Sequence, residues 1–250
     1  MDTLGTLPED ILIDILARLP AKLLMRFKSV GTSWYDLISD PDFAKEQLNR
    51  SLATQPDLHF IYRKPTIHMG DFDSFDNDVE LNYPFKSPIH GGACIIGCCN
   101  GLLCLWNFDY FNFIVFLFNP TTRTYTMLPF SPRPPHVAHH KHEFIHGFGY
   151  DSVTDDYKFV RILQCLSQDK SEFYSELMVY SLNLDSWFRV LDHVPFRFNC
   201  RRATGVLVEE KLHWVTGTEL REFPHPIVSF SLNFHCFSEV AVPVVDINSY

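Results

Sequence analysis

The spacing of apolar positions divides the chain into two parts. In the first fifty or so residues, apolar side chains recur three or four positions apart, as on one face of a helix. The clearest stripe consists of Ile11, Leu12, Ile15, Leu16 and Leu19. Beyond Ser51, short apolar runs alternate with Pro, Gly, Asn and Asp, a pattern typical of strands joined by turns. We therefore expect a small helical domain followed by a larger all-β domain.

Proline and glycine set the limits of the predicted helices. Pro8 suits a first helical turn, where a missing N–H costs nothing, and Pro20 ends that helix. Gly31 ends a second helix, and Pro41 opens a last one that continues to about Leu48. A unit of this size cannot bury all its apolar residues, and an exposed apolar patch usually marks an interaction surface. We predict a partner-binding helical module; the residues alone leave open a plain N-terminal cap on the rest of the chain.

The stretch from Leu7 to Ile38, LPEDILIDILARLPAKLLMRFKSVGTSWYDLI, resembles the F-box. Proteins of that family dock on the Skp adaptor of SCF-type (Skp–cullin–F-box) ubiquitin ligases. The resemblance implies that the residues contacting the adaptor are Leu7, Pro8, Ile11, Ile15, Leu16, Leu19, Leu23, Leu24, Val30 and Trp34. It also implies that Arg26, Phe27 and Leu37 hold the module together.

The second part of the chain contains a weak internal repeat. The segments FNPTTRTY (Phe118–Tyr125), YSLNLDSW (Tyr180–Trp187) and FSLNFHCF (Phe230–Phe237) each begin and end with an aromatic residue. Their separation is near the roughly 50 residues of a kelch-type propeller blade. The repeat predicts a hairpin with an inner strand, a polar turn and an outer strand anchored by an aromatic side chain. The alternative is that any all-β protein produces such pairs.

The order of the segments CNGLLCL…LFNPTTRTYTMLP, GFGYDSVTDDYKFVRI, VYSLNLDSWFRV, GVLVEEKLHWV and SFSLNFHCFSEV resembles a plant F-box family. That family, which includes S-locus F-box-like proteins, carries a kelch-like F-box-associated β-propeller that recruits substrates. The resemblance implies an α+β chain of several domains: residues 1–50 as the helical F-box, 51–90 as a linker with first strands, and 91–250 as the β-propeller-like domain. Because the chain stops at Tyr250, earlier than is usual in that family, we expect the β domain to be C-terminally short.

Composition narrows the possible partners. The chain is 46% hydrophobic and 20% charged, as in globular proteins, and its net charge of −9 argues against binding nucleic acid or an anionic membrane. The start lacks the basic segment of a secretory signal, so we expect no such signal. The longest apolar run near the middle, Phe113–Phe118, is far shorter than the roughly 20 residues that span a bilayer. The odd number of cysteines, seven, favours reduced thiols and a cytoplasmic or nuclear location.

Three stretches invite a metal-binding interpretation, and we favour none of them. The cysteines Cys94, Cys98, Cys99 and Cys104 lie in strand-like runs where adjacent thiols point to opposite faces, so buried free thiols are expected. The histidines from His136 to His146 begin in the Pro-rich stretch SPRPPHVAHHKHEF, which predicts a long loop. The acidic stretch Gly70–Glu80 lacks the glycine and glutamate of an EF-hand, which favours a solvated loop.

The sequence also lacks the motifs of an enzyme. It contains no Gly-x-Ser-x-Gly elbow, no phosphate-binding glycine loop and no RING-like array of Cys and His. We expect a non-catalytic adaptor without cofactor, bound through Skp to cullin and RING subunits and recruiting an unknown protein substrate. Two alternatives stay open: a truncated or non-ligase F-box protein that binds Skp without delivering a substrate, and a propeller enzyme whose polar groups would come from the histidine-rich stretch.

Overall fold

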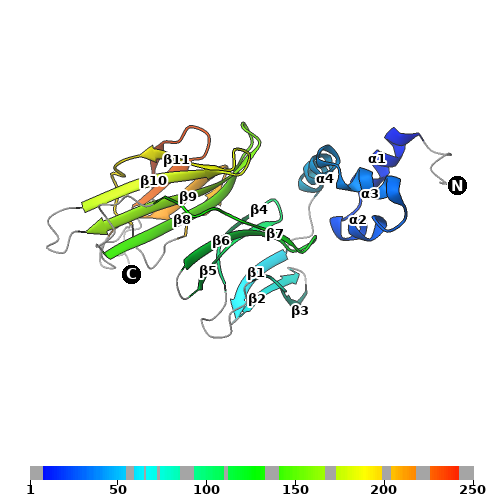
Figure 1. Ribbon diagram of the computed structural model, residues 1–250, viewed down its shortest axis with the longest axis horizontal. Helices are drawn as coiled ribbons and strands as arrows, with labels where there is room; N and C mark the ends of the chain where they lie inside the picture. The colour runs from blue at the N-terminus through cyan, green and yellow to red at the C-terminus, as the bar shows by residue number, and fades with distance from the viewer. Residues whose placement is uncertain are drawn as a thin grey trace, which may run out of the picture. The chain divides into compact units, whose positions relative to one another are not determined.

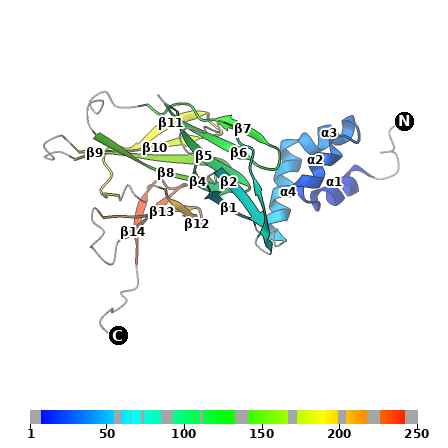
Figure 2. The same ribbon diagram turned by 90° about the horizontal axis from the view of Figure 1, so that it is seen from below.

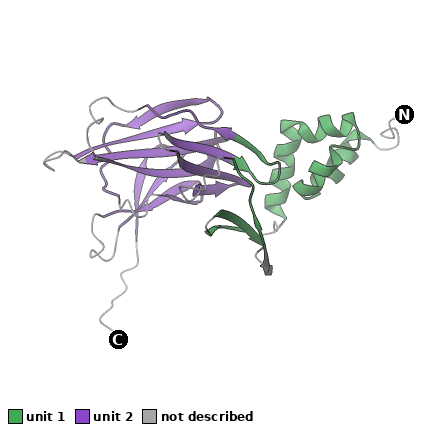
Figure 3. Ribbon diagram, turned by 60° about the horizontal axis from the view of Figure 1, so that its bottom comes forward, with its two compact units in different colours: residues 1–92, 118–125 green, residues 93–117, 126–250 purple. Residues whose placement is uncertain are grey.

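The fold consists of a helical module followed by strands (Figure 1). The computed structural model describes residues 8–54, 59–64, 66–71, 74–84, 93–109, 112–132, 141–166, 173–198, 204–217 and 226–241. The chain divides into two compact units (Figure 3). Unit 1 contains Met1–Gly92 and Phe118–Tyr125, and unit 2 contains Ala93–Leu117 and Thr126–Tyr250. Each unit is described by itself below.

Four helices form the module: α1 (Glu9–Ala17), α2 (Ala21–Phe27), α3 (Thr32–Ser39) and α4 (Pro41–Ala53). The Asp40 side chain caps α4 by accepting hydrogen bonds from the backbone N–H groups of Asp42 (2.8 Å) and Phe43 (3.1 Å). The helix continues past its predicted end near Leu48 to Ala53, and Arg50 in its last turn forms ion pairs with Asp14 and Glu46. The module has its own core, made of Leu12, Leu16, Ala17, Leu24, Ile38 and Phe43.

The described strands form four antiparallel sheets, in each of which the strand order follows the chain. The first sheet contains β1 (His59–Lys64), β2 (Thr66–Asp71) and β3 (Ser74–Glu80). The second contains β4 (Cys94–Cys99), β5 (Leu102–Asp109), β6 (Asn112–Asn119) and β7 (Thr124–Met127). The third contains β8 (Lys141–Asp151), β9 (Asp156–Leu166), β10 (Phe173–Ser181) and β11 (Ser186–Leu191). The fourth contains β12 (Val206–Val208), β13 (Lys211–Val215), β14 (Ile227–Ser231) and β15 (Phe237–Val240). Successive meanders of this kind are the blades of a propeller-like domain, so the predicted fold class is confirmed.

The three repeated segments are the outer hairpins of three blades, as predicted. The aromatic residues that begin and end a copy are cross-strand partners, Tyr180 with Trp187 and Phe230 with Phe237. The sixth residue of every copy has a positive φ: 59° at Arg123, 47° at Asp185 and 53° at His235. The side chain of the second residue of every copy accepts a hydrogen bond from a backbone N–H inside the turn; these residues are Asn119, Ser181 and Ser231. The copies therefore share a turn conformation more than a residue type.

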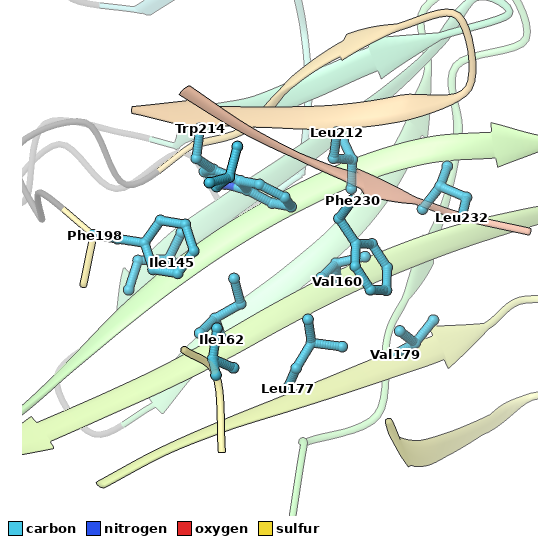
Figure 4. Packing of buried hydrophobic residues seen from close by; sticks show 12 residues of the cluster. Ile145, Val160, Ile162, Leu177, Val179, Phe198, Leu212, Trp214, Phe230 and Leu232 are labelled. Atoms are coloured by element: carbon cyan, nitrogen blue, oxygen red, sulfur yellow. The ribbon is translucent and has the colours of Figure 1, made fainter. Parts of the chain in front are cut away.

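The first strands of three blades approach one another closely. β8 contacts β4, β12 and β13, and Figure 2 shows it beside them. Glycine permits this approach: a Cβ added at Gly147 would lie 2.6 Å from Leu212, and one at Gly149 would lie 2.6 Å from Leu207. The core between the third and fourth blades contains twelve buried residues, among them Trp214 and Phe230 (Figure 4).

Two stretches predicted as loops contain strands. β8 begins at Lys141, so His142 and His146 lie on a strand, while residues 133–140 of the histidine-rich stretch fall outside the described residues. The apolar alternation of β8 was obscured by its glycines, which the close approach of the blades requires. The acidic stretch was likewise misassigned, because β3 pairs with β2 and the carboxylate of Asp78 accepts a hydrogen bond from the hydroxyl of Tyr62 (2.6 Å). Residues 72–73 of that stretch are not described.

Candidate functional site

The α1 helix carries two adjacent apolar stripes. Leu12 and Leu16, four positions apart, face the core of the module, and Leu16 is only 1% exposed. Ile11 and Ile15 form the neighbouring stripe, and their side chains are 47% and 46% exposed. Such branched aliphatic side chains are normally buried, so α1 has more apolar surface than the module itself covers.

Exposed apolar side chains continue beyond α1. Leu23 on α2 is 37% exposed, and Val30 between α2 and α3 is 61% exposed. Tyr35 on α3, which the sequence prediction missed, is 54% exposed, with the Lys28 ammonium 5.4 Å from the centre of its ring. An aromatic residue directly after Trp34 on a short helix was the available signal. These side chains could form the apolar part of a protein interface.

The other residues predicted to contact an adaptor differ in their exposure. Pro8 is exposed, and its carbonyl accepts hydrogen bonds from the first turn of α1. Leu24 is 3% exposed and lies with Leu16 in the core, so both support the surface from beneath. Leu19 and Trp34 are partly buried against the same core. Leu7 lies outside the described residues.

The residues predicted to hold the module together also differ in their exposure. Phe27 and Leu37 pack against the core, and the ring of Phe27 meets that of Trp34 edge to face with the centroids 5.7 Å apart. Arg26 is exposed, and its backbone carbonyl accepts a hydrogen bond from the Ser29 hydroxyl. The ring of Phe27 thus holds Trp34 against the core of the module.

An ionic cluster fixes α1 against α4. The guanidinium of Arg50 donates to the carboxylate of Asp14 (2.5 Å) and to that of Glu46 (2.7 Å), and Arg18 pairs with Asp14 from the next turn of α1 (2.8 Å). The hydrogen bond from Arg50 lowers the pKa of the Asp14 carboxyl below its ordinary value. The cluster orients α1, and with it the stripe of Ile11 and Ile15.

Two cysteines of the β domain lie in environments that suppress their reactivity. Burial raises the pKa of the Cys104 thiol, and it raises that of Cys99 to about 11, so neither thiol is a ready nucleophile near neutral pH. Within the described ranges, three or more Cys, His, Asp or Glu side chains never gather as a metal site would require. Among the described helices, none is long and apolar enough to cross a membrane.

Comparison with known proteins agrees with this geometry. The F-box-like family matches residues 4–49, and the family described as F-box associated beta propeller domain matches residues 73–248. The chain is 36% identical over 228 residues to F-box protein CPR1 of Arabidopsis thaliana, an alignment that covers 85% of this chain and 54% of the relative. It is 28% identical over 269 residues to the F-box/kelch-repeat protein At3g23880 of the same plant, covering 95% of this chain and 66% of the relative. The chain thus spans between about half and two thirds of the length of these relatives.

Proposed function

Because this chain belongs to the F-box proteins that carry an F-box associated β-propeller domain, we propose that it is a substrate-recognition adaptor of an SCF-type ubiquitin ligase. In this proposal the helical module binds a Skp-type adaptor and, through it, cullin and RING subunits. The β domain binds a target protein. The chain itself performs no bond-making step.

The mechanism that we propose is proximity. A target held by the β domain is brought near a ubiquitin-charged enzyme supplied by the partner subunits, which raises the effective concentration of its lysines. Holding two reactants in one complex in this way requires two binding surfaces and no catalytic side chain. The high pKa values of the Cys99 and Cys104 thiols are consistent with that division of work.

The exposed stripe of Ile11 and Ile15 is the observation that carries the proposal. The core beneath it is filled by Leu12 and Leu16, so the stripe lies outside that core and about half of each isoleucine is left exposed. Covering two isoleucine side chains in an interface gains free energy in proportion to the apolar area removed from water. A partner with a complementary apolar groove would supply that gain.

The test is binding of the purified full chain to a purified Skp adaptor by titration calorimetry. Ile11→Asp/Ile15→Asp places two unpaired charges in an interface that excludes water, and we expect at least a roughly 100-fold loss of affinity. Both positions are about half exposed, so the module should keep its helical circular dichroism. A substitution at the 1% exposed Leu16 would unfold the module instead and is unsuitable.

Leu52→Asp is the matched control, because Leu52 is an apolar residue on α4 that is 54% exposed and is not among the predicted contacts. It should bind the adaptor as the wild type does. Full affinity of the double variant would contradict the proposal. Ubiquitin transfer in a reconstituted ligase then separates a working adaptor from a protein that binds Skp without delivering a substrate.

A further inference from the structure

A cleft of about 350 Å³ opens on unit 2 between the second and third blades. Its walls are aromatic: Phe113 on β6, Phe144 on β8, Phe159 on β9 and Trp187 on β11. The indole N–H of Trp187 donates to the carbonyl of Pro129 (2.9 Å), which joins the two blades beside the cleft. This volume is at the small end of the roughly 300–1,000 Å³ of ligand sites and suits a single large side chain.

His146 lines the cleft, and one of its ring nitrogens has no hydrogen-bond partner among the described residues. Its side chain is 4% exposed, and none of the described residues offers its Nε2 atom a hydrogen-bond partner. Stacking holds the ring in place, with centroids 4.9 Å from Phe113 and 5.5 Å from Phe159. Buried polar atoms are nearly always paired with protein or ordered water. The unpartnered Nε2 belongs to a residue that lines the cleft, so a bound ligand could supply its hydrogen bond.

The backbone of His146 is fixed as firmly as its ring. Its carbonyl accepts hydrogen bonds from the N–H of Gly205 (2.7 Å) and from the indole N–H of Trp214 (3.0 Å). Both donors belong to the fourth blade, on the opposite side of β8 from the cleft. The imidazole is therefore preorganised and has little freedom to lose on binding.

The charge in the cleft is already balanced. The guanidinium of Arg161 donates to the carboxylate of Glu176 (2.6 Å) and lies over the rings of Phe144 (5.7 Å) and Trp187 (5.9 Å). Burial first, and the charge of Arg161 second, lower the pKa of His146 to about 3, so its ring is neutral near pH 7. Among the described residues that line the cleft, an anionic ligand would find neither a second cation nor a charged imidazole.

We propose that the cleft receives a tyrosine side chain of the target protein, with the phenol hydroxyl at Nε2 of His146; this inference rests on the proposed function. A neutral imidazole presents either an N–H or a lone pair at Nε2, and a phenol hydroxyl can satisfy both. An indole N–H can only donate. The phenol ring packs against the aromatic walls, and the neighbouring Phe130, 66% exposed, offers apolar surface to the residues that flank the tyrosine.

The experiment uses immobilised pools of short random peptides whose central residue is fixed as tyrosine, phenylalanine, phosphotyrosine or alanine. The full-length chain should bind the tyrosine pool roughly 5- to 100-fold more tightly than the phenylalanine pool, because the latter leaves Nε2 buried and unpaired. His146→Phe keeps an aromatic ring and removes the nitrogen, so it should bind both pools equally. His213→Phe on β13, outside the cleft, is the matched control and should keep the wild-type preference.

Equal binding of the tyrosine and phenylalanine pools by the wild type would overturn the proposal. So would preference for phosphotyrosine, retained preference in His146→Phe, or failure to bind any aromatic pool above the alanine pool. Adaptor binding by the same preparations keeps the two proposals apart. A chain that prefers tyrosine but ignores the Skp adaptor fails only as a ligase subunit, and a chain that binds the adaptor but not the tyrosine pool fails only in the cleft.

Discussion

The two faces of the third blade differ sharply although they belong to the same four strands. The face toward the fourth blade is filled. Its centre is apolar and presents Ile145, Val160, Ile162, Leu177 and Val179, all with 0% exposure, while the buried Lys158–Asp151 ion pair lies toward one end of the same face. The opposite face, toward the second blade, presents His146, Arg161 and Glu176 among its aromatic residues and borders the cleft. Because side chains alternate along a strand, one sheet can complete a filled core on one side and line a cleft on the other. Three predictions test that division, from the largest effect to the smallest.

Trp214→Ala should cause the largest loss of stability, about 3–5 kcal/mol. It leaves a cavity in the core between the third and fourth blades and removes the hydrogen bond to the carbonyl of His146. Urea unfolding of the full chain, followed by circular dichroism of the β domain, measures the loss. Trp187→Ala is the comparison on the cleft face, where the side chain is only partly buried, and it should cost roughly 1–2 kcal/mol. Equal losses at the two tryptophans would show that the faces do not differ.

Glu176→Gln should cost about 3 kcal/mol, because it leaves the buried Arg161 guanidinium without its counter-charge. The double variant Arg161→Met/Glu176→Met removes both charges and should recover most of that loss, since apolar side chains often replace a buried pair without penalty. The same urea titration serves for both. A double variant less stable than Glu176→Gln would mean that the ion pair makes a net stabilising contribution to this face of the blade, larger than the cost of burying its two charges.

Lowering the pH should reduce the unfolding free energy of the wild type more than that of the His146→Phe variant. The pKa of His146 is about 3 in the folded chain and about 6.5 in an unfolded one, so between these values the unfolded chain binds a proton that the folded chain does not. Stability is therefore lost as the pH falls below about 6.5, and this histidine should account for about 2 kcal/mol at pH 5. The difference in unfolding free energy between wild type and variant, measured near pH 7 and pH 5, should change by that amount. An unchanged difference would place His146 in contact with water.

Local sequence patterns predicted most of the fold. Pro41 opens α4 as predicted, whereas α1 ends at Ala17 and α2 at Phe27, before the predicted limits at Pro20 and Gly31. The three aromatic-framed segments are hairpins. The stripe on α1 was also visible, but spacing could not separate Leu16 in the core from Ile15 on the surface, because both follow the same helical period. Only the packing of α1 against the other helices distinguishes them.

The cleft could not be predicted from local patterns. His146 stood out only as one of several histidines, and its glycine neighbours masked the alternation of β8. Its environment is assembled from Phe113, Trp187 and Trp214, which are far from it in the sequence and meet it only when three blades pack together. A buried nitrogen without a partner is a property of that packing and has no signature in the residue order.

The sequential strand order within each sheet has a consequence for how the chain acquires its structure. Within each sheet, the described strands pair only with neighbours along the chain, so each blade closes only short loops, and contacts of this kind form fastest. The bond from Trp214 to His146 spans 68 residues and requires two finished blades. Pulse-labelled hydrogen exchange should therefore find the β8–β11 amides protected before the Trp214 indole. During synthesis from the N-terminus, the blades would be completed in their order along the chain, and the seams that join them would follow.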